Sequence, residues 1–283
     1  MTTETSGFDE DISMMIDNME VVSNSFSNIR ECYVSQSGHA RIFSAQRFGK
    51  RYMLKCLKPD FLMTPAYRLV LNKEFEIGIQ LDHPCICHTI SMEAVPELGL
   101  AIVMEHIDGM TLEAFMQEKK LTKELARKFV GQLTDALAYM HSKQMLHRDL
   151  KPSNVMVTHQ GHNIRLIDFS LSDSDAFSIF KSPCGTSGYI APELMISNAC
   201  SDIRCDIYSL GVLMACMARH TGDKKMMQTA ITCMNHAPEK RPAKMSEIVI
   251  PPDATTAEKV AIIILTITSM ILIALIVYRL NTV

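Results

Sequence analysis

Residues 147–154 read HRDLKPSN, and residues 168–170, fourteen positions after the last of these, read DFS. Transfer of a phosphoryl group requires a carboxylate that accepts the proton of the attacking hydroxyl, a cation beside the transferred phosphate, and oxygen ligands for Mg²⁺. The stretch contains one candidate for each role: Asp149 as the base, Lys151 as the cation, and Asn154 with Asp168 as the metal ligands.

At these residues the chain resembles the eukaryotic-type (Hanks-type) serine/threonine protein kinases, whose catalytic loop and metal-binding DFG motif read almost identically. The resemblance implies an α+β, two-lobed fold with a small β-rich N-terminal lobe and a mostly helical C-terminal lobe. It implies ATP and Mg²⁺ as cofactors, and transfer of the γ-phosphoryl group to Ser or Thr hydroxyls of protein substrates. In that mechanism Asp149 is the base, Lys151 stabilises charge on the γ-phosphate, and Asn154 with Asp168 hold Mg²⁺.

Upstream, residues 29–57 have the pattern of hairpin strands, at residues 32–34, 42–45 and 52–57. In the resemblance, Lys55 is the strand lysine that orients the α- and β-phosphates. A lone strand lysine is ordinarily a solvent-facing charge. Lys55 follows the loop between the first two strands at nearly the sequence distance found in the family, which favours a role in binding the nucleotide.

That loop, residues 35–42, departs most from the family pattern. Kinases carry GxGxxG here so that backbone amides can approach the phosphates, whereas this chain reads SQSGHARI. Small residues fall at all three glycine positions, and the one Gly is displaced by one, so weaker ATP binding is expected. The nucleotide-contacting residues implied in this run are Ser37, Gly38, Ala40 and Ile42.

Residues 69–81 have the apolar spacing of a helix that ends at residues 82–84, Asp-His-Pro. Glu74 stands where family members hold the helix glutamate that pairs with the strand lysine. Glu76 is the competing candidate, and an exposed helix acid is the alternative for either. The offset to the His-Pro dipeptide favours Glu74.

Residues 99–105, GLAIVME, indicate a buried strand, and residues 106–109 indicate a hinge-like turn. Similar proteins bind adenine through main-chain groups at this hinge, which implies Glu105 and Ile107 here. Met104 would guard the pocket behind the adenine. The other Met residues, of the 21 in the chain, are interpreted as adaptable core filling.

Thr122 is expected to cap a long amphipathic helix that ends at His141-Ser142 and leads into the catalytic loop. In such proteins this helix positions Asp149. The resemblance also implies a role for Arg148, which in similar enzymes pairs with a phosphate on the activation segment.

The activation segment is expected to run from Asp168 to Glu193 and to end in the family's GTxxYxAPE pattern. Ser170 replaces the DFG glycine, and should restrict how the segment switches without removing a metal ligand. Thr186 matches the threonine that contacts the catalytic Asp and Lys. The implied phosphorylation site is Ser182, with Ser172, Ser174 and Ser178 as alternatives.

Residues 206–211, DIYSLG, resemble the start of the central helix of the C-terminal lobe, and Asp206 is implied to anchor the catalytic-loop backbone. Arg241 matches the arginine that forms a buried pair with Glu193, and breaking such a pair is costly. Only 34 residues separate Asp206 from Arg241. The helix that usually helps to dock substrates is therefore expected to be truncated or missing.

Residues 260–277 read VAIIILTITSMILIALIV, without a charge. As a helix this run would be about 27 Å long, close to the hydrocarbon thickness of a bilayer. We expect a transmembrane helix rather than a buried core helix, because it is apolar on every face. More Lys and Arg precede the run than follow it, which places the kinase-like side in the cytosol in a tail-anchored arrangement.

The expected organisation is therefore an acidic segment, a kinase-like domain, a linker, the span and a short tail, at residues 1–28, 29–250, 251–259, 260–278 and 279–283. The acidic segment lacks the basic start and apolar run of a signal peptide. Ile12, Met15 and Ile16 are its candidate docking residues.

The composition excludes other classes of protein. A net charge of −3 argues against a nucleic-acid-binding surface. The nine Cys lack the CxxC pairs and His partners of zinc sites, and they do not suggest a disulfide framework. The expected partners are protein substrates, a membrane, and a second copy of the chain for autophosphorylation.

The main alternative is a membrane-tethered pseudokinase that acts as a nucleotide-binding scaffold. The altered glycine loop, Ser170 and the short C-terminal lobe favour it. Intact functional residues oppose it, because a scaffold has no need for all of them: Lys55, Glu74, Asp149, Asn154 and Asp168. A non-kinase membrane adaptor would require the catalytic loop to be a coincidence.

Overall fold

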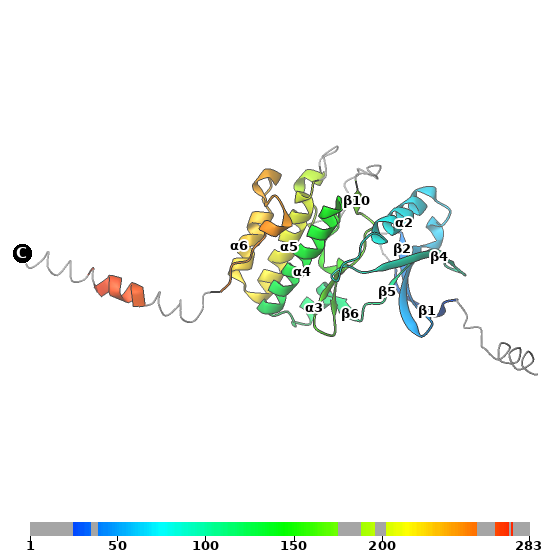
Figure 1. The fold of residues 1–283 in the computed structure, drawn as a ribbon, viewed down its shortest axis with the longest axis horizontal. Coiled ribbons are helices and arrows are strands. Elements are labelled where there is room, and N and C mark those ends of the chain that lie inside the picture. Colours follow the sequence, from blue (N-terminus) through cyan, green and yellow to red (C-terminus); the bar gives the residue numbers. More distant parts are fainter. Residues whose placement is uncertain are drawn as a thin grey trace, which may run out of the picture. The chain divides into compact units, whose positions relative to one another are not determined.

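The computed structural model describes residues 25–34, 39–174, 188–195, 202–253, 264–271 and 273. The chain divides into two compact units, Met1–Ile248 and Val249–Val283. The first unit consists of a β-sheet lobe followed by a mostly helical lobe (Figure 1). The two-lobed α+β fold expected from the sequence is confirmed.

The N-terminal lobe is built on a five-stranded antiparallel sheet in the order β1-β2-β3-β5-β4. A two-residue turn joins β2 to β3, and its residues Phe48 and Gly49 both have positive φ, 51° and 74°, as tight hairpins of this kind require. Alternation along β3 buries Leu54 and Cys56 in the core of the lobe and turns Lys55 to the opposite face. The strands are β1 (Ser27–Val34), β2 (Ala40–Arg47), β3 (Lys50–Leu57), β4 (Thr89–Val95) and β5 (Gly99–Glu105).

Helix α2 (Pro65–Gly78) packs on this sheet through Leu71, which lies in one apolar cluster with Leu57 and Ile102. The predicted helix at residues 69–81 was wrong at both ends. Proline at the first position is pre-set for the helix, so α2 starts earlier. It ends earlier, at Gly78, where a Cβ would lie only 2.3 Å from the Thr89 hydroxyl oxygen.

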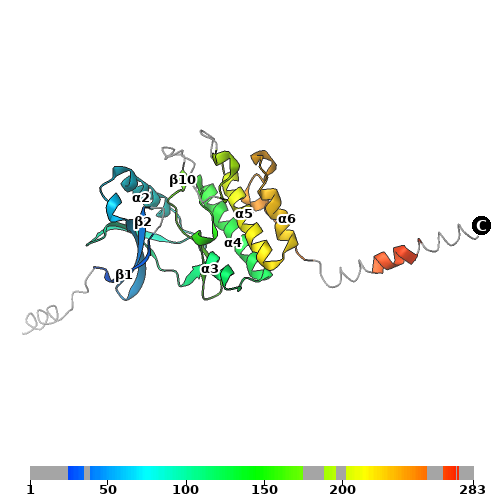
Figure 2. The same cartoon turned by 180° about the vertical axis from the view of Figure 1, so that it is seen from behind.

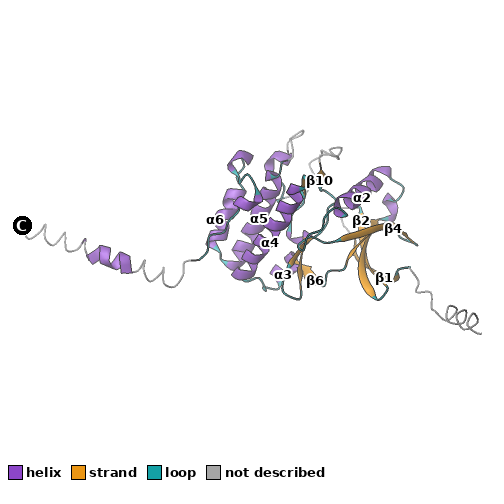
Figure 3. Cartoon of the chain, viewed as in Figure 1, coloured by secondary structure: helices purple, strands orange, loops and turns teal. Residues whose placement is uncertain are grey.

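The C-terminal lobe contains three longer helices that lie side by side in both views (Figures 1 and 2), and Figure 3 shows them with the short strands beside them. Thr122 caps α4 as predicted, its hydroxyl accepting a hydrogen bond from Leu125 N at 3.2 Å. The helices are α3 (Leu112–Gln117), α4 (Lys123–Ser142), α5 (Arg204–Thr221) and α6 (Lys224–Cys233). The strands are β6 (Gly109–Thr111), β7 (Met145–Leu146), β8 (Val155–Thr158), β9 (Ile164–Leu166) and β10 (Asp173–Ser174).

Helices α5 and α6 approach closely at Gly211. A Cβ at this position would lie 2.7 Å from Cys233 Cβ and 3.1 Å from the carbonyl oxygen of Ala230. Because the second contact is to backbone, it cannot be relieved by turning a side chain. The short second half of this lobe therefore depends on a glycine for its packing.

Replacing Gly211 with Ala should lower the free energy of unfolding by about 1–3 kcal/mol, the usual cost of overpacking. This cost outweighs the gain of about 1 kcal/mol that Ala brings to a helix. Urea denaturation measures the change. The matched control is Gly131→Ala in α4, where a Cβ meets nothing within 4 Å and where stability should rise. Equal effects of the two changes would contradict the close approach at Gly211.

In the second unit the described residues are 249–253, which have no regular secondary structure, and 264–271 with 273, which are helical. In the part of the chain that the structure describes, no helix is both long enough and apolar enough to cross a membrane. The predicted span at residues 260–278 lies largely outside the described residues and stays a prediction.

Candidate functional site

A cavity of about 290 Å³ lies between the two lobes. The sheet contributes its roof and the C-terminal lobe its floor. Five residues predicted to contact a nucleotide line it directly, namely Ile42, Lys55, Glu74, Glu105 and Ile107, as does Asp168, a predicted metal ligand. The full lining is Ile42, Met53, Lys55, Glu74, Cys87, Met104, Glu105, His106, Ile107, Gly109, Met156, Ile167 and Asp168.

The hinge at the edge of the cavity has main-chain groups available for a ligand. The amide of Glu105 is used, since it donates to the carbonyl oxygen of His88 at 3.0 Å. The amide of Ile107 has no acceptor among the described residues. Its position on the cavity wall suits hydrogen bonding to a flat heterocycle.

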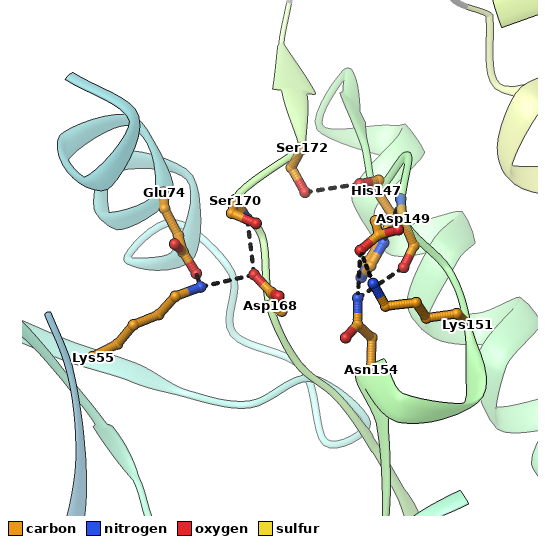
Figure 4. A network of polar contacts seen from close by, with 9 residues as sticks. All are labelled: Lys55, Glu74, His147, Asp149, Lys151, Asn154, Asp168, Ser170 and Ser172. Atoms are coloured by element: carbon orange, nitrogen blue, oxygen red, sulfur yellow. Dashed lines mark hydrogen bonds and ion pairs between the residues drawn. The ribbon is translucent and has the colours of Figure 1, made fainter. Parts of the chain in front are cut away.

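Lys55, on the wall of the cavity, lies between two carboxylates. Its Nζ is 2.5 Å from Glu74 Oε1 and 2.8 Å from Asp168 Oδ1 (Figure 4). Glu76, the competing candidate for this pair, is exposed on α2. The expected Lys55–Glu74 pair is therefore present, while its role in binding a nucleotide stays a prediction.

In the group formed by Lys55, Glu74 and Asp168, burial and the neighbouring charges shift the pKa values in opposite directions. Burial opposes a charge on Lys55, yet the carboxylates of Asp168 and Glu74 hold the Lys55 pKa well above its ordinary value. Burial also outweighs the lysine at Glu74 and raises the pKa of that carboxyl. At Asp168 burial is overcome by Lys55 and by hydrogen bonds from Ser170, which keep the Asp168 pKa well below its usual range. Asp168 is thus firmly ionised, as a metal ligand must be.

A second polar group forms around Asp149 on the catalytic loop. Lys151 Nζ and Asn154 Nδ2 donate to Asp149 Oδ2 at 2.7 Å and 2.9 Å. Asp149 and Asn154 are nearly fully buried, with 6% and 5% of their surface exposed. The base, cation and amide that the sequence predicted are therefore brought together in one cluster.

The Asn154 amide is oriented by its neighbours. Its nitrogen also donates to the main-chain oxygen of Asp149 at 2.9 Å. Because both bonds use the NH₂ end, the amide oxygen is turned away from Asp149 (Figure 4). An amide oxygen and the Asp168 carboxylate are the hard oxygen donors that Mg²⁺ prefers, with nucleotide phosphates and water as its other usual ligands. The residues present fit such an ion.

Asp206 of α5 fixes the backbone of the catalytic loop by hydrogen bonds. Its carboxylate accepts hydrogen bonds from the amides of His147 (2.9 Å) and Arg148 (2.8 Å), and it lies 2.8 Å from His141 Nε2. Burial opposes its charge, but the hydrogen bonds from His141 and from the Arg148 amide lower the Asp206 pKa. The contact expected of Asp206 with the loop backbone is present. It helps hold Arg148 at a φ of 65°, which is costly for a residue with a side chain.

The Arg241–Glu193 pair is also present. Arg241 donates to both carboxylate oxygens of Glu193, at 2.6 Å and 2.8 Å. The guanidinium side chain is fully buried, and that of Glu193 is 20% exposed. This bidentate pair joins the end of the activation segment to the last part of the C-terminal lobe.

Several residues predicted from the sequence are not part of the described site. Ser37, Gly38, Ser182 and Thr186 lie outside the described residues, as does Ser178, so their roles stay predictions. Ala40 begins β2 and is not part of the cavity lining. Ser172 is fully buried and donates to the His147 carbonyl oxygen, which argues against it as a phosphorylation site in this conformation.

Ser170 fits the observed backbone without strain. The residue with a left-handed backbone in this motif is Asp168, with a φ of 67°, and Ser170 is not among the positive-φ residues. Its amide donates to Asp168 Oδ1 at 3.2 Å. The serine therefore helps to place the carboxylate, which the sequence did not predict.

The interpretation of Met as core filling missed Met53 and Met156. Met53 lines the roof of the cavity and Met156 its floor. Strand alternation could have found Met53, because it lies two residues before Lys55 and so shares its face. Met156 lies two residues after Asn154, on β8.

Replacing Glu74 with Gln should weaken ADP binding about tenfold, because a hydrogen bond to a charged partner contributes about 1.5–3 kcal/mol. Lys55 would keep Asp168 as its one carboxylate partner and would be held less firmly. Isothermal titration with Mg²⁺ and ADP measures the change. Glu76→Gln on the exposed face of α2 is the control, with affinity expected to stay within twofold of the parent. Equal losses in both variants would rule out the specific role of Glu74.

Curated relatives of this chain are protein kinases by name. The chain is 34% identical over 147 residues to CBL-interacting serine/threonine-protein kinase 8 of Arabidopsis thaliana, covering 51% of this chain and 33% of the relative. It is 35% identical over 149 residues to serine/threonine-protein kinase ppk25 of Schizosaccharomyces pombe, covering 52% of this chain and 35% of the relative. It is 33% identical over 146 residues to serine/threonine-protein kinase kin-29 of Caenorhabditis elegans, covering 51% of this chain and 18% of the relative. The aligned region therefore spans about a third or less of these relatives.

A family model covers much more of the chain. It is described as the protein kinase domain, and it matches residues 36–262. The match includes both polar clusters, the hinge and the Arg241–Glu193 pair. With the two-lobed fold and the cavity between its lobes, this match shows that the chain belongs to the protein kinase family.

Proposed function

We propose that this protein transfers the γ-phosphoryl group of ATP to Ser or Thr hydroxyls of protein substrates. The observation that carries the proposal is that the polar cluster around Lys55, which lines the cavity, lies beside a second polar cluster around Asp149 (Figure 4). One cluster, around Lys55, suits nucleotide phosphates, and the other, around Asp149, suits a hydroxyl that must lose a proton (Figure 4). The names of the curated relatives support serine/threonine specificity.

Each residue contributes a distinct step. The base of the nucleotide would lie between Met53 and Met156 and bond to the Ile107 amide. Lys55, held by Glu74, would bind the α- and β-phosphates. Asp149 would accept the proton of the substrate hydroxyl as it attacks, and Lys151 would stabilise charge on the transferred group.

Asn154 and Asp168 are the residues that would hold Mg²⁺. The ion, when bound, neutralises charge on the phosphates that develops during transfer. Lys55 keeps Asp168 ionised, and the hydrogen bond to Asp149 fixes the orientation of the Asn154 amide. Both residues are thus prepared to bind the ion.

The test is transfer of label from γ-labelled ATP to a generic protein substrate in the presence of Mg²⁺, with the modified residues identified by mass spectrometry. Phosphoserine or phosphothreonine that forms with the parent, and not with Asp168→Asn, is the expected result. Autophosphorylation is followed over a range of protein concentrations, since transfer between two copies would rise with concentration.

The pseudokinase scaffold gives a different outcome. The run SQSGHARI in place of a glycine-rich loop is the observation that favours it. A folded protein that binds ATP and labels neither itself nor the substrate would replace the kinase proposal with the scaffold.

We further propose that residues 260–278 anchor the protein in a membrane, with the kinase domain in the cytosol. The support is the uncharged run of apolar residues and the excess of Lys and Arg before it. The full chain expressed in cells should stay in the membrane pellet after alkaline carbonate washing. Ile267→Lys/Ile271→Lys should release it, and retention of this variant in the pellet would contradict the proposal.

A further inference from the structure

The exposed end of the N-terminal sheet carries a shallow basic pocket that the proposed reaction does not use. Its volume is about 340 Å³, and Arg30 of β1 and Arg51 of β3 lie on its two sides. Ser44 and Gln46 of β2 form its floor. We call this feature the arginine pocket, defined by Asn28, Arg30, Ser44, Ala45, Gln46 and Arg51.

The arginine pocket lies on the same face of the sheet as the nucleotide cavity. Arg30 is paired with Ser44 across β1 and β2, and Ser44 with Met53 across β2 and β3. Residues directly opposite on antiparallel strands project from the same face. Met53 of β3 lines the nucleotide cavity, and Arg51 of the arginine pocket lies two residues before it on the same strand.

Among the described residues, the positive charges of the arginine pocket have no carboxylate partners. Two other arginines of the sheet are paired, Arg41 with Glu31 and Arg47 with Glu93. Arg30, Lys50 and Arg51 are exposed, and among the described residues no carboxylate contacts them. The surface is thus arranged to receive negative charge.

A source of negative charge precedes β1 directly in the chain. Residues 1–24 contain no Lys or Arg and carry six acids: Glu4, Asp9, Glu10, Asp11, Asp17 and Glu20. Glu20 is ten residues before Arg30. Ser27, the first residue of β1, is seven residues after Glu20. An extended chain of seven residues spans up to about 23–25 Å, so the acids are within reach of the pocket.

We propose that the acidic segment, residues 1–24, docks on the arginine pocket of its own chain. Opposite charge draws the two together, and the short tether gives the segment an effective concentration of about millimolar. A contact too weak to form between separate molecules can therefore form within one. The docked segment places carboxylates beside the entrance for the nucleotide.

The experiment is zero-length cross-linking of the full-length protein with a carbodiimide, which joins a carboxylate to a lysine amine only when they touch. Lys50 is the reporter because it is exposed at the start of β3 and lines a neighbouring pocket together with Arg51. Peptides that join Lys50 to an acid of residues 1–24 are expected, with a yield that falls roughly fivefold or more in 0.5 M NaCl, where exposed charges are screened. The same drop is expected for Arg30→Gln/Arg51→Gln, which retains every cross-linking group.

Two controls make the result specific. Arg219→Gln/Lys224→Gln removes two exposed positive charges from the C-terminal lobe, and its Lys50 cross-link should match the parent. Mixing ¹⁵N-labelled and unlabelled protein shows whether a link is within one chain. Absence of the Lys50 link, its persistence in Arg30→Gln/Arg51→Gln, or links chiefly between differently labelled chains would each overturn the proposal.

Discussion

Replacing Asp149 with Asn should lower the rate of phosphoryl transfer by about 10²–10⁴-fold, the usual contribution of a general base. The amide side chain has nearly the same shape as the carboxylate but cannot accept a proton at neutral pH. Its oxygen can still accept the hydrogen bonds that Lys151 and Asn154 donate to Asp149 Oδ2 at 2.7 Å and 2.9 Å. The loop should therefore keep its structure while losing its chemistry.

The measurement is the steady-state rate with labelled ATP and a protein substrate, together with the melting temperature and the dissociation constant for ADP. Both of the latter should stay close to those of the parent. Asp135→Asn is the matched control, since it removes the same charge from an exposed site on α4. A variant that keeps more than about a tenth of the parental rate would remove Asp149 from the role of base.

Replacing Arg241 with Ala should lower the free energy of unfolding by about 3–5 kcal/mol, because it leaves a largely buried carboxylate without its partner. Glu193 would lose both of its bonds, at 2.6 Å and 2.8 Å. The guanidinium also donates to three main-chain oxygens, which would be left unsatisfied: those of Arg204, Asn235 and His236. A loss of this size is a large part of the 5–15 kcal/mol that typically stabilises a domain.

Urea denaturation measures the loss, and Lys240→Ala serves as the control because that neighbouring base is exposed. The double variant Glu193→Gln/Arg241→Met should be more stable than Arg241→Ala, since it removes the stranded charge. If Arg241→Ala does not fold, Glu193→Gln gives a milder test. An Arg241→Ala protein as stable as Lys240→Ala would show that the pair contributes little.

Residues whose role requires one side-chain type at one position were the most predictable from the sequence. Glu74 and Glu76 are two positions apart on α2, so they point about 200° away from each other and only one can face β3. Counting from the His-Pro dipeptide selected Glu74, and the structure places it against Lys55. The Arg241–Glu193 pair and the Thr122 cap were predictable for the same reason, because each requires one residue type at one position.

Elements defined by distant pairing were not predictable. Strands β6, β8 and β9 were missed, because each has only three or four residues and too few positions to reveal a period. Strand β4 was missed as well, since a shift in its pairing between Thr89 and Ser91 breaks the alternation. The floor of the cavity depends on β8, which explains why Met156 was not identified.

Asp206 also bears on how the protein is made. Its carboxylate is the acceptor for the amides of His147 and Arg148, yet it lies 59 and 58 residues later in the chain. At a synthesis rate of about 5–20 residues per second, the catalytic loop leaves the ribosome about 3–12 s before Asp206 does. During that interval the loop amides have no native acceptor. The active centre is thus assembled only after α5 has emerged, late in translation.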